Sequence, residues 1–386
     1  MIRSLSARAA TSSLATLTRF GVPALLLAAT AVLARAEKSE PSLRELAAPA
    51  FRIGVAMEAA HLDGVPARAA LLRQHFNTVT PENSMKWASV QPDEGVFTFK
   101  QADAIADLAG QHDAWLVGHT LVWQHQTPDW VFQNATRDVL LRRMRDHIHT
   151  VVGRYRGRVK GWDVVNEAIN QQGELKTESP WHRIIGPDYI EHAFRFAHEA
   201  DPDAELYYND YLLEMPAKRE GTLRLVKRLK AAGLRIDGVG MQGHYGLKAN
   251  IAETEKTIVA LHAAGVDVMV TELDISVLPA AWQHIGADIA AMFEYRAELD
   301  PYADGLPPAV ARQQADVYRD LFALFVKHRD KMSRVTFWGL DDASSWLNHW
   351  PIRGRTDYPL LFDRNAQPKP AFHAVVEALK KKETPR

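Results

Sequence analysis

Two glutamates lie where separate apolar stretches of the sequence end, Glu167 in the string WDVVNE (residues 162–167) and Glu272 in the string TELD (residues 271–274). A single glutamate after a strand is more often a helix cap or a solvated loop residue. Two such carboxylates, each beside amide or hydroxyl side chains, favour a joint chemical role. Glycosidic cleavage requires such a pair, because the leaving oxygen needs a proton and the oxocarbenium-like carbon needs an anion beneath it. A carboxyl separation of about 5 to 5.5 Å would give retention and a wider one inversion, and the sequence leaves that distance open.

Other apolar runs also end in polar and aromatic side chains. These ends are the strings TPENSMKW (80–87), GHTLVW (118–123), YND (208–210), QGH (242–244) and WGL (338–340). His119 and His244 end different runs and have carboxylates nearby, so a metal-dependent barrel hydrolase is an alternative. It would need three or four converging ligands with an open position. The aromatic and amide neighbours favour a sugar ligand instead, with no metal and no cofactor.

Eight short apolar, β-branched or aromatic runs alternate with longer amphipathic stretches, which is the pattern of βαβ units. We expect strands at residues 51–57, 76–80, 115–119, 159–166, 205–209, 238–242, 266–271 and 335–340. Helices are expected between them, for example at 138–154 and at 221–232, the latter closed by Gly233. The unbroken series predicts an α/β fold, a single (β/α)8 TIM barrel with its active site at the C-terminal ends of the strands. A doubly wound open sheet is the competing architecture, but no Gly-rich phosphate turn follows the first run.

Composition narrows the class of partner. The 386 residues are 47% hydrophobic and 24% charged, which is typical of a soluble domain with a substantial core. The formal net charge of -1 gives no strong field to gather nucleic acid or an anionic membrane, so a neutral polymer is the easier partner. The sequence has no Cys, which excludes disulfides, thiolate metal sites and thiol nucleophiles.

The N-terminus predicts export. Arg3, Arg8 and Arg19 precede an uncharged run at residues 20–33 that is too short to span a bilayer comfortably, and small residues flank Arg35. We expect a signal peptide at 1–36, cleaved to leave one catalytic domain at 37–386 in the periplasm or outside the cell. An uncleaved anchor is the alternative. Residues 278–308 form the longest connection, with a helix expected near 285–295, and His147 and His149 are expected at solvated helix positions.

The strings WDVVNE, TELD and GHTLVW, with YNDY at 208–211, closely resemble glycoside hydrolase family 10, the retaining endo-β-1,4-xylanases. The resemblance extends over residues 43–379. It implies endo-hydrolysis of xylan by double displacement, with Glu167 as acid/base and Glu272 as nucleophile. Xylan and xylo-oligosaccharides are the implied partners, no membrane is expected after signal cleavage, and we expect a monomer.

The same resemblance implies a set of sugar-binding residues. Asn166 resembles the residue that binds the sugar 2-hydroxyl, and His244 the imidazole that orients the nucleophile. The resemblance implies that the walls of the cleavage subsite are formed by His119, Trp123, Gln242 and Trp338. It implies that the next sugars toward the non-reducing end are bound by Glu82, Asn83, Lys86 and Trp346.

One residue departs from the family pattern, because Leu212 stands where a polar Asn is expected. This puts in doubt a loop hydrogen bond or a distal subsite contact. Two further alternatives stay open. One is a β-1,4-glucanase on the same scaffold, which would need room for a C6 hydroxymethyl group beside Trp338 and Trp346. The other is a non-catalytic sugar-binding barrel.

Overall fold

Eight parallel strands close into a ring in the computed structural model, which describes residues 40–279 and 292–381. Their order is β1-β2-β3-β4-β5-β6-β8-β9, and β9 pairs with β1. The short β7 is an extra strand beside the end of β8. The strands are β1 (Arg52–Met57), β2 (Thr78–Pro81), β3 (Trp115–Val122), β4 (Val159–Asn166), β5 (Glu205–Asp210), β6 (Gly238–Met241), β7 (His244–Gly246), β8 (Asp267–Ser276) and β9 (Met332–Phe337). The predicted (β/α)8 barrel is confirmed.

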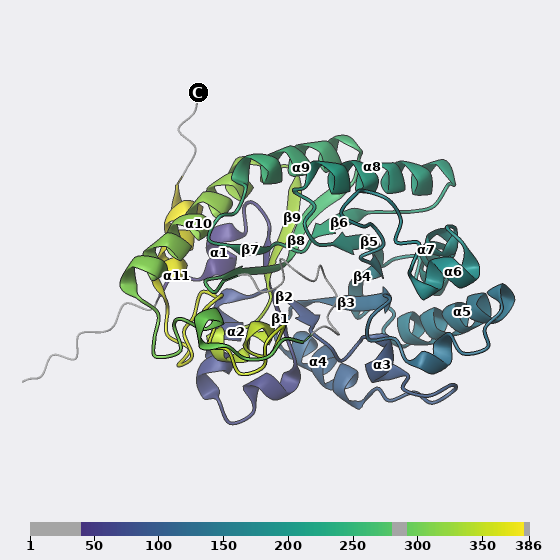
Figure 1. Cartoon of the computed structure of the whole chain (residues 1–386), viewed down its shortest axis with the longest axis horizontal. Helices are drawn as coiled ribbons and strands as arrows, with labels where there is room; N and C mark the ends of the chain where they lie inside the picture. The colour runs from purple at the N-terminus through teal and green to yellow at the C-terminus, as the bar shows by residue number, and fades with distance from the viewer. Residues whose placement is uncertain (1–39, 280–291, 382–386) are drawn as a thin grey trace, which may run out of the picture. The chain divides into compact units, whose positions relative to one another are not determined.

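Helices follow the strands and pack around the outside of this ring (Figure 1). Thr136 caps α5 by accepting a hydrogen bond from the Val139 amide, and α8 and α10 begin with a proline in the first turn. The helices are α1 (Leu43–Ala47), α2 (Pro66–His75), α3 (Trp87–Val90), α4 (Lys100–Gln111), α5 (Arg137–Arg154), α6 (Pro180–Ile185), α7 (Tyr189–Ala200), α8 (Pro216–Ala231), α9 (Ile251–Ala263), α10 (Pro308–Lys327) and α11 (Pro370–Lys380). In the described ranges, none of them combines the length and apolarity needed to cross a membrane.

Element boundaries differ from the expectation where polar residues continue a strand or a helix. β8 runs five residues past the predicted end because its last three residues pair with β7, where His244 lies opposite Asp274. β9 begins and ends three residues early. α8 begins at Pro216, five residues before the predicted start, and ends at Ala231, one residue before the predicted end; the C-cap Ala232 and then Gly233 at φ +69° follow it.

Most of the apolar core lies between the ring and the helices. A small separate cluster consists of Val117, Tyr207 and Met269, which come from β3, β5 and β8, three alternate strands of the ring. The adjacent Gly161 leaves room for Tyr207, since a Cβ there would lie 2.3 Å from the tyrosine Oη. A strand residue with any side chain would therefore displace this ring. The interior of the barrel is filled by side chains, as expected for a core rather than a pore.

One helix expectation was wrong. His147 is fully buried rather than solvated, because it stacks on Trp87 at a ring distance of 3.6 Å and its Nδ1 lies 2.8 Å from Gln91 Oε1. Burial lowers its pKa to about 3, so it is neutral. The expected signal peptide and most of the helix expected near 285–295 lie outside the described residues, and Met292 to Tyr295 contain only an isolated bridge at Phe293.

Candidate active site

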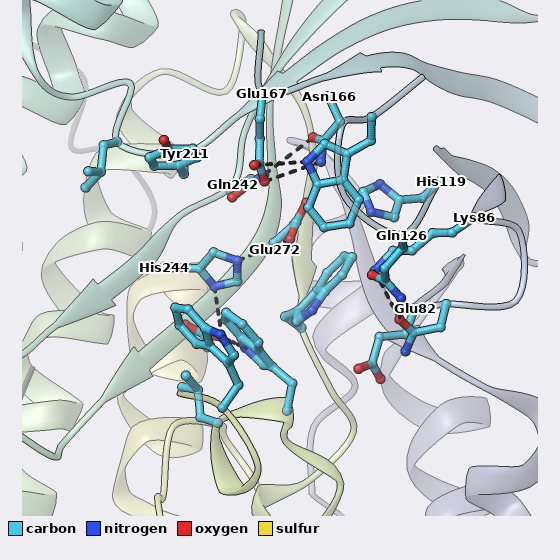
Figure 2. A pocket seen from close by; sticks show the side chains of 18 of the residues that line it. Glu82, Lys86, His119, Gln126, Asn166, Glu167, Tyr211, Gln242, His244 and Glu272 are labelled. Carbon is cyan, nitrogen blue, oxygen red and sulfur yellow. Dashed lines mark hydrogen bonds and ion pairs between the residues drawn. The ribbon is translucent and has the colours of Figure 1, made fainter. Parts of the chain in front are cut away.

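A cavity of about 700 Å³ opens at the C-terminal ends of the strands and brings the predicted site residues together. Figure 2 shows Glu167 and Glu272 directed into it from β4 and β8. All twelve residues singled out from the sequence line it: Glu82, Asn83, Lys86, His119, Trp123, Asn166, Glu167, Gln242, His244, Glu272, Trp338 and Trp346. Their convergence is a finding of the structure, while their individual roles stay predictions.

Glu167 follows β4 in an unusual backbone conformation. Its φ is +59°, in the left-handed region that a residue with a Cβ seldom adopts, and its amide donates to the carbonyl of Asn209 on β5 at 2.9 Å. The carboxylate accepts hydrogen bonds from Trp123 Nε1 at 3.0 Å and from Gln242 Nε2 at 2.9 Å. Strain of this kind persists only where the surroundings impose it, and it concentrates at functional positions.

Glu272 is held as an anion by its neighbours. Its Oε1 accepts a hydrogen bond from Asn209 Nδ2 at 2.7 Å, and its Oε2 lies 3.1 Å from His244 Nε2. Burial alone raises the pKa of Glu272, but the hydrogen bond from His244, the charge interactions with His119 and His244 and the bond from Asn209 together outweigh burial and hold the pKa below its usual value. The carboxylate is therefore ionised at neutral pH.

His244 is a cation in this arrangement. Its second ring nitrogen, Nδ1, forms an ion pair with Asp274 Oδ2 at 2.9 Å. Burial lowers the pKa of His244, but Asp274 and Glu272 raise it further, to about 10. Glu272, His244 and Asp274 thus form a charged row in which an imidazolium lies between two carboxylates.

A chain of amide side chains connects the two glutamates. Asn209 Nδ2 donates to Asn166 Oδ1 at 3.0 Å as well as to Glu272, and Asn166 Nδ2 lies 3.3 Å from Glu167 Oε1. Thr271 Oγ1 donates to Asn209 Oδ1 at 2.6 Å and fixes the orientation of that amide. Because Asn166 and Asn209 are paired in register on β4 and β5, the strand pairing itself sets this geometry.

Polar side chains after β2 form one end of the cavity. Lys86 Nζ donates to Asn83 Oδ1 at 3.1 Å and to Gln126 Oε1 at 2.8 Å, and Gln126 Nε2 donates to Asn83 Oδ1 at 3.1 Å. Burial, opposed by Lys86, raises the pKa of Glu82 to about 7. Such a set offers both donors and acceptors to a hydroxyl-rich ligand.

Aromatic rings form another wall. Trp346 stacks on Trp350 at 4.8 Å and donates from Nε1 to Asp274 Oδ2 at 2.9 Å, which fixes its ring. Trp338 meets the edge of His119 at 5.3 Å, and His119 Nδ1 lies 2.9 Å from Asp163 Oδ2. Flat apolar faces beside fixed polar groups suit an uncharged ring with hydroxyl substituents.

Several residues of the site were not singled out from the sequence. They are Gln126, Tyr211 and Trp350 in the cavity wall, and Asp163, Asn209 and Asp274 as supports. Asp274 could have been found, because it is two residues from Glu272 and side chains two apart on a strand share a face. Asp163 required the tertiary pairing with His119. In the described part of the chain, no three or more His, Asp or Glu side chains are grouped so that they could hold a metal ion.

Comparison with known proteins extends over nearly the whole described chain. Residues 42–378 match the sequence model of "Glycosyl hydrolase family 10". The chain is 44% identical to endo-1,4-β-xylanase A of Xylanibacter ruminicola, over 94% of this chain and 98% of that protein. It is 45% identical to an endo-1,4-β-xylanase of Geobacillus stearothermophilus, over 88% and 98% respectively. The solved structure of a GH10 endoxylanase retrieved from a sugarcane soil metagenome superimposes with a TM-score of 0.82 at 43% identity, over 88% of this chain and 100% of that one.

Proposed function

The chain belongs to glycosyl hydrolase family 10, and from this premise we propose that it is an endo-1,4-β-xylanase that hydrolyses internal bonds of xylan with retention of anomeric configuration. The observation that carries the proposal is the convergence of Glu167 and Glu272 on one cavity through a shared amide chain. The xylanase names of the similar proteins support the choice of substrate.

In the first half of the reaction, Glu272 attacks the anomeric carbon while Glu167 gives its proton to the leaving oxygen. The bond from carbon to the leaving oxygen breaks, an ester bond to Glu272 forms, and the shortened chain leaves as an alcohol. The imidazolium of His244 and the amide of Asn209 keep Glu272 ionised and aimed before the attack. Trp123 and Gln242 hold the carboxyl group of Glu167 in place.

In the second half, Glu167 takes a proton from water, and the resulting hydroxide equivalent attacks the same carbon. The ester bond breaks, Glu272 regains its charge, and Glu167 is again protonated for the next cycle. Esterification removes the Glu272 charge, which favours ionisation of Glu167 at the stage where a base is needed. One residue can thus serve both halves.

The cavity wall favours a sugar without a hydroxymethyl group. Trp346 is fixed by its hydrogen bond to Asp274 and its stacking on Trp350, and Trp338 by its contact with His119. Rings held in this way cannot easily move aside for a C6 group. This argument favours xylan over the β-1,4-glucan alternative.

The test is digestion of xylan beside carboxymethyl cellulose, with proton NMR of the first product. We expect rapid cleavage of xylan, little cleavage of the cellulose derivative and an initial β-anomer. An initial α-anomer would refute the double displacement, and equal rates on both polymers would refute the substrate assignment. Binding of xylo-oligosaccharides without hydrolysis would support the sugar-binding alternative.

We also infer that residues 1–36 are a signal peptide and that the mature protein, residues 37–386, acts as a monomer in the periplasm or outside the cell. The basic residues, the short apolar run and the small residues around Arg35 support this inference. N-terminal sequencing of the exported protein should begin at Glu37, and light scattering should give the mass of one chain. Protein retained in the membrane with Met1 intact would contradict it.

A further inference from the structure

A hairpin after β4 carries a lysine back toward Glu167. The chain leaves Glu167, forms a bridge between Ile169 and Leu175, and returns so that the amide of Lys176 donates to the carbonyl of Ala168 at 2.9 Å. Lys176 and Glu167, which are nine positions apart in the sequence, thus become neighbours in space. The hairpin is stiffened by Asn170, whose Oδ1 accepts from two later backbone amides.

The ammonium group of Lys176 lies 4.0 Å from Glu167 Oε2, and the two side chains are only 6% and 7% exposed. At this burial, solvent screens their interaction far less than on the surface. The same ammonium group lies 5.0 Å from the centre of the Tyr211 ring. Lys176 is not among the described residues that line the cavity, although Glu167 is.

Other charged groups surround Glu167: Lys86 and Lys218 interact with it electrostatically, and the imidazolium of His244 lies in the same cavity, paired with Glu272 and Asp274. Lys218 on α8 is near, but it is committed to Asp210 at the end of β5 by an ion pair at 2.6 Å. Lys86 after β2 is held by Asn83 and Gln126. The carboxyl groups of Glu272, which lines the same cavity, and of Asp210, which interacts electrostatically with Glu167, are the acidic groups near it. Lys176 instead pairs with Glu167 itself.

We propose that Lys176 is a positioning residue for the reaction, whose charge stabilises the ionised form of Glu167. The ionised form arises when Glu167 has given its proton to the leaving oxygen, and it is the form that accepts a proton from water. The lysine therefore favours transfer of the proton to the leaving oxygen, keeps Glu167 ionised before it acts as a base, and sets the pH above which the proton donor is lost. This inference rests on the proposed function, since it assigns Glu167 the acid/base role.

The test compares pH profiles of kcat/KM on xylo-oligosaccharides for the full-length mature enzyme and its variants. In Lys176→Met, loss of the charge should let Glu167 keep its proton longer, so the alkaline limb moves up by about 0.5 to 1 pH unit. Lys176→Arg keeps the charge and should leave the limb near its wild-type position. KM should change less than kcat, because Lys176 does not line the cavity.

Arg224→Met is the matched control. Arg224 on α8 donates to the carbonyl of Gly173 at 2.6 Å and contacts Glu174, so its loss also removes a cation that contacts this hairpin, but at an exposed position. Its profile should match the wild type. An unmoved limb in Lys176→Met, or an equal shift in Arg224→Met, would overturn the inference.

A second neutral variant keeps the test valid if Lys176→Met does not fold. Lys176→Gln is polar and of similar reach, and it should show the same upward shift of the alkaline limb. If neither neutral variant shifts the limb while the wild type cleaves xylan, the inference fails and the proposed function stands. If the wild type itself does not cleave xylan, the proposed function fails.

Discussion

Glu272 depends on its neighbours for its charge, and removing that charge tests its role at the residue scale. Glu272→Gln keeps the shape of the side chain and the contact with Asn209, but an amide cannot attack the anomeric carbon. We expect kcat on xylan to fall by more than about 10⁴-fold, as for other covalent nucleophiles. Steady-state assays would measure this, with thermal melting to show that the variant is folded. Retention of full activity would exclude Glu272 as nucleophile.

Leu212 is a second residue whose local conformation leads to a prediction. It lines the cavity beside Tyr211 at φ +53°, a region that Asn tolerates better than Leu. Leu212→Asn should therefore raise the free energy of unfolding by roughly 0.5 kcal/mol. Denaturant melts would measure the change.

Asn134 provides the reciprocal control for this prediction. It has φ +52° and is exposed, so Asn134→Leu should lower the free energy of unfolding by a similar amount. If both substitutions change stability in the same direction, backbone conformation is not the cause.

At the scale of elements, strand pairing brings the proposed catalytic side chains together, and the packing inside the ring keeps the strands in place. Gly161 of β4 faces Tyr207 of β5, and a Cβ would approach the tyrosine Oη to 2.3 Å. Gly161→Ala should lower the free energy of unfolding by about 1 to 3 kcal/mol through overpacking. Chemical denaturation would measure this loss.

The matched glycine is Gly153 near the end of α5, where an added Cβ meets nothing within 4 Å. Gly153→Ala should leave stability unchanged or raise it by up to about 1 kcal/mol, because alanine favours a helix. A loss in both variants would show that the tyrosine contact is not responsible.

At the scale of the whole molecule, His244 links stability to pH. Its pKa is about 10 in the folded chain and about 6.5 ordinarily, so the imidazolium is stabilised on folding. Its contribution is complete below pH 6.5 and is lost as the pH rises through about 10. His244→Gln should therefore lower the free energy of unfolding by more than about 1 kcal/mol at pH 6, and the difference should shrink toward pH 10.

His147→Gln is the control for this pH dependence. The pKa of His147 is lowered to about 3, so His147 is neutral in both folded and unfolded chains above pH 8. The stability difference between this variant and the wild type should stay constant from pH 8 to 10. A constant difference for His244→Gln as well would contradict the ion pairs assigned to it.

The sequence by itself determined the fold and predicted twelve of the residues that line the cavity. The alternation of apolar runs and amphipathic stretches predicted the closed barrel, because strand and helix periods are local properties of the chain. The position of Glu167 and Glu272 at the ends of the fourth and seventh runs predicted a common face. Motif resemblance then identified ten further residues among those that line the cavity.

Only the tertiary structure decided which groups support these residues. Lys176 reaches Glu167 through a hairpin, Asp163 meets His119 across a strand pair, and His147 is buried by its stacking on Trp87. No periodic pattern or motif spacing in the sequence indicates any of these contacts. Burial and charge at a site are sums over neighbours from distant segments, so the ionisation of Glu272 and His244 follows from the folded arrangement alone.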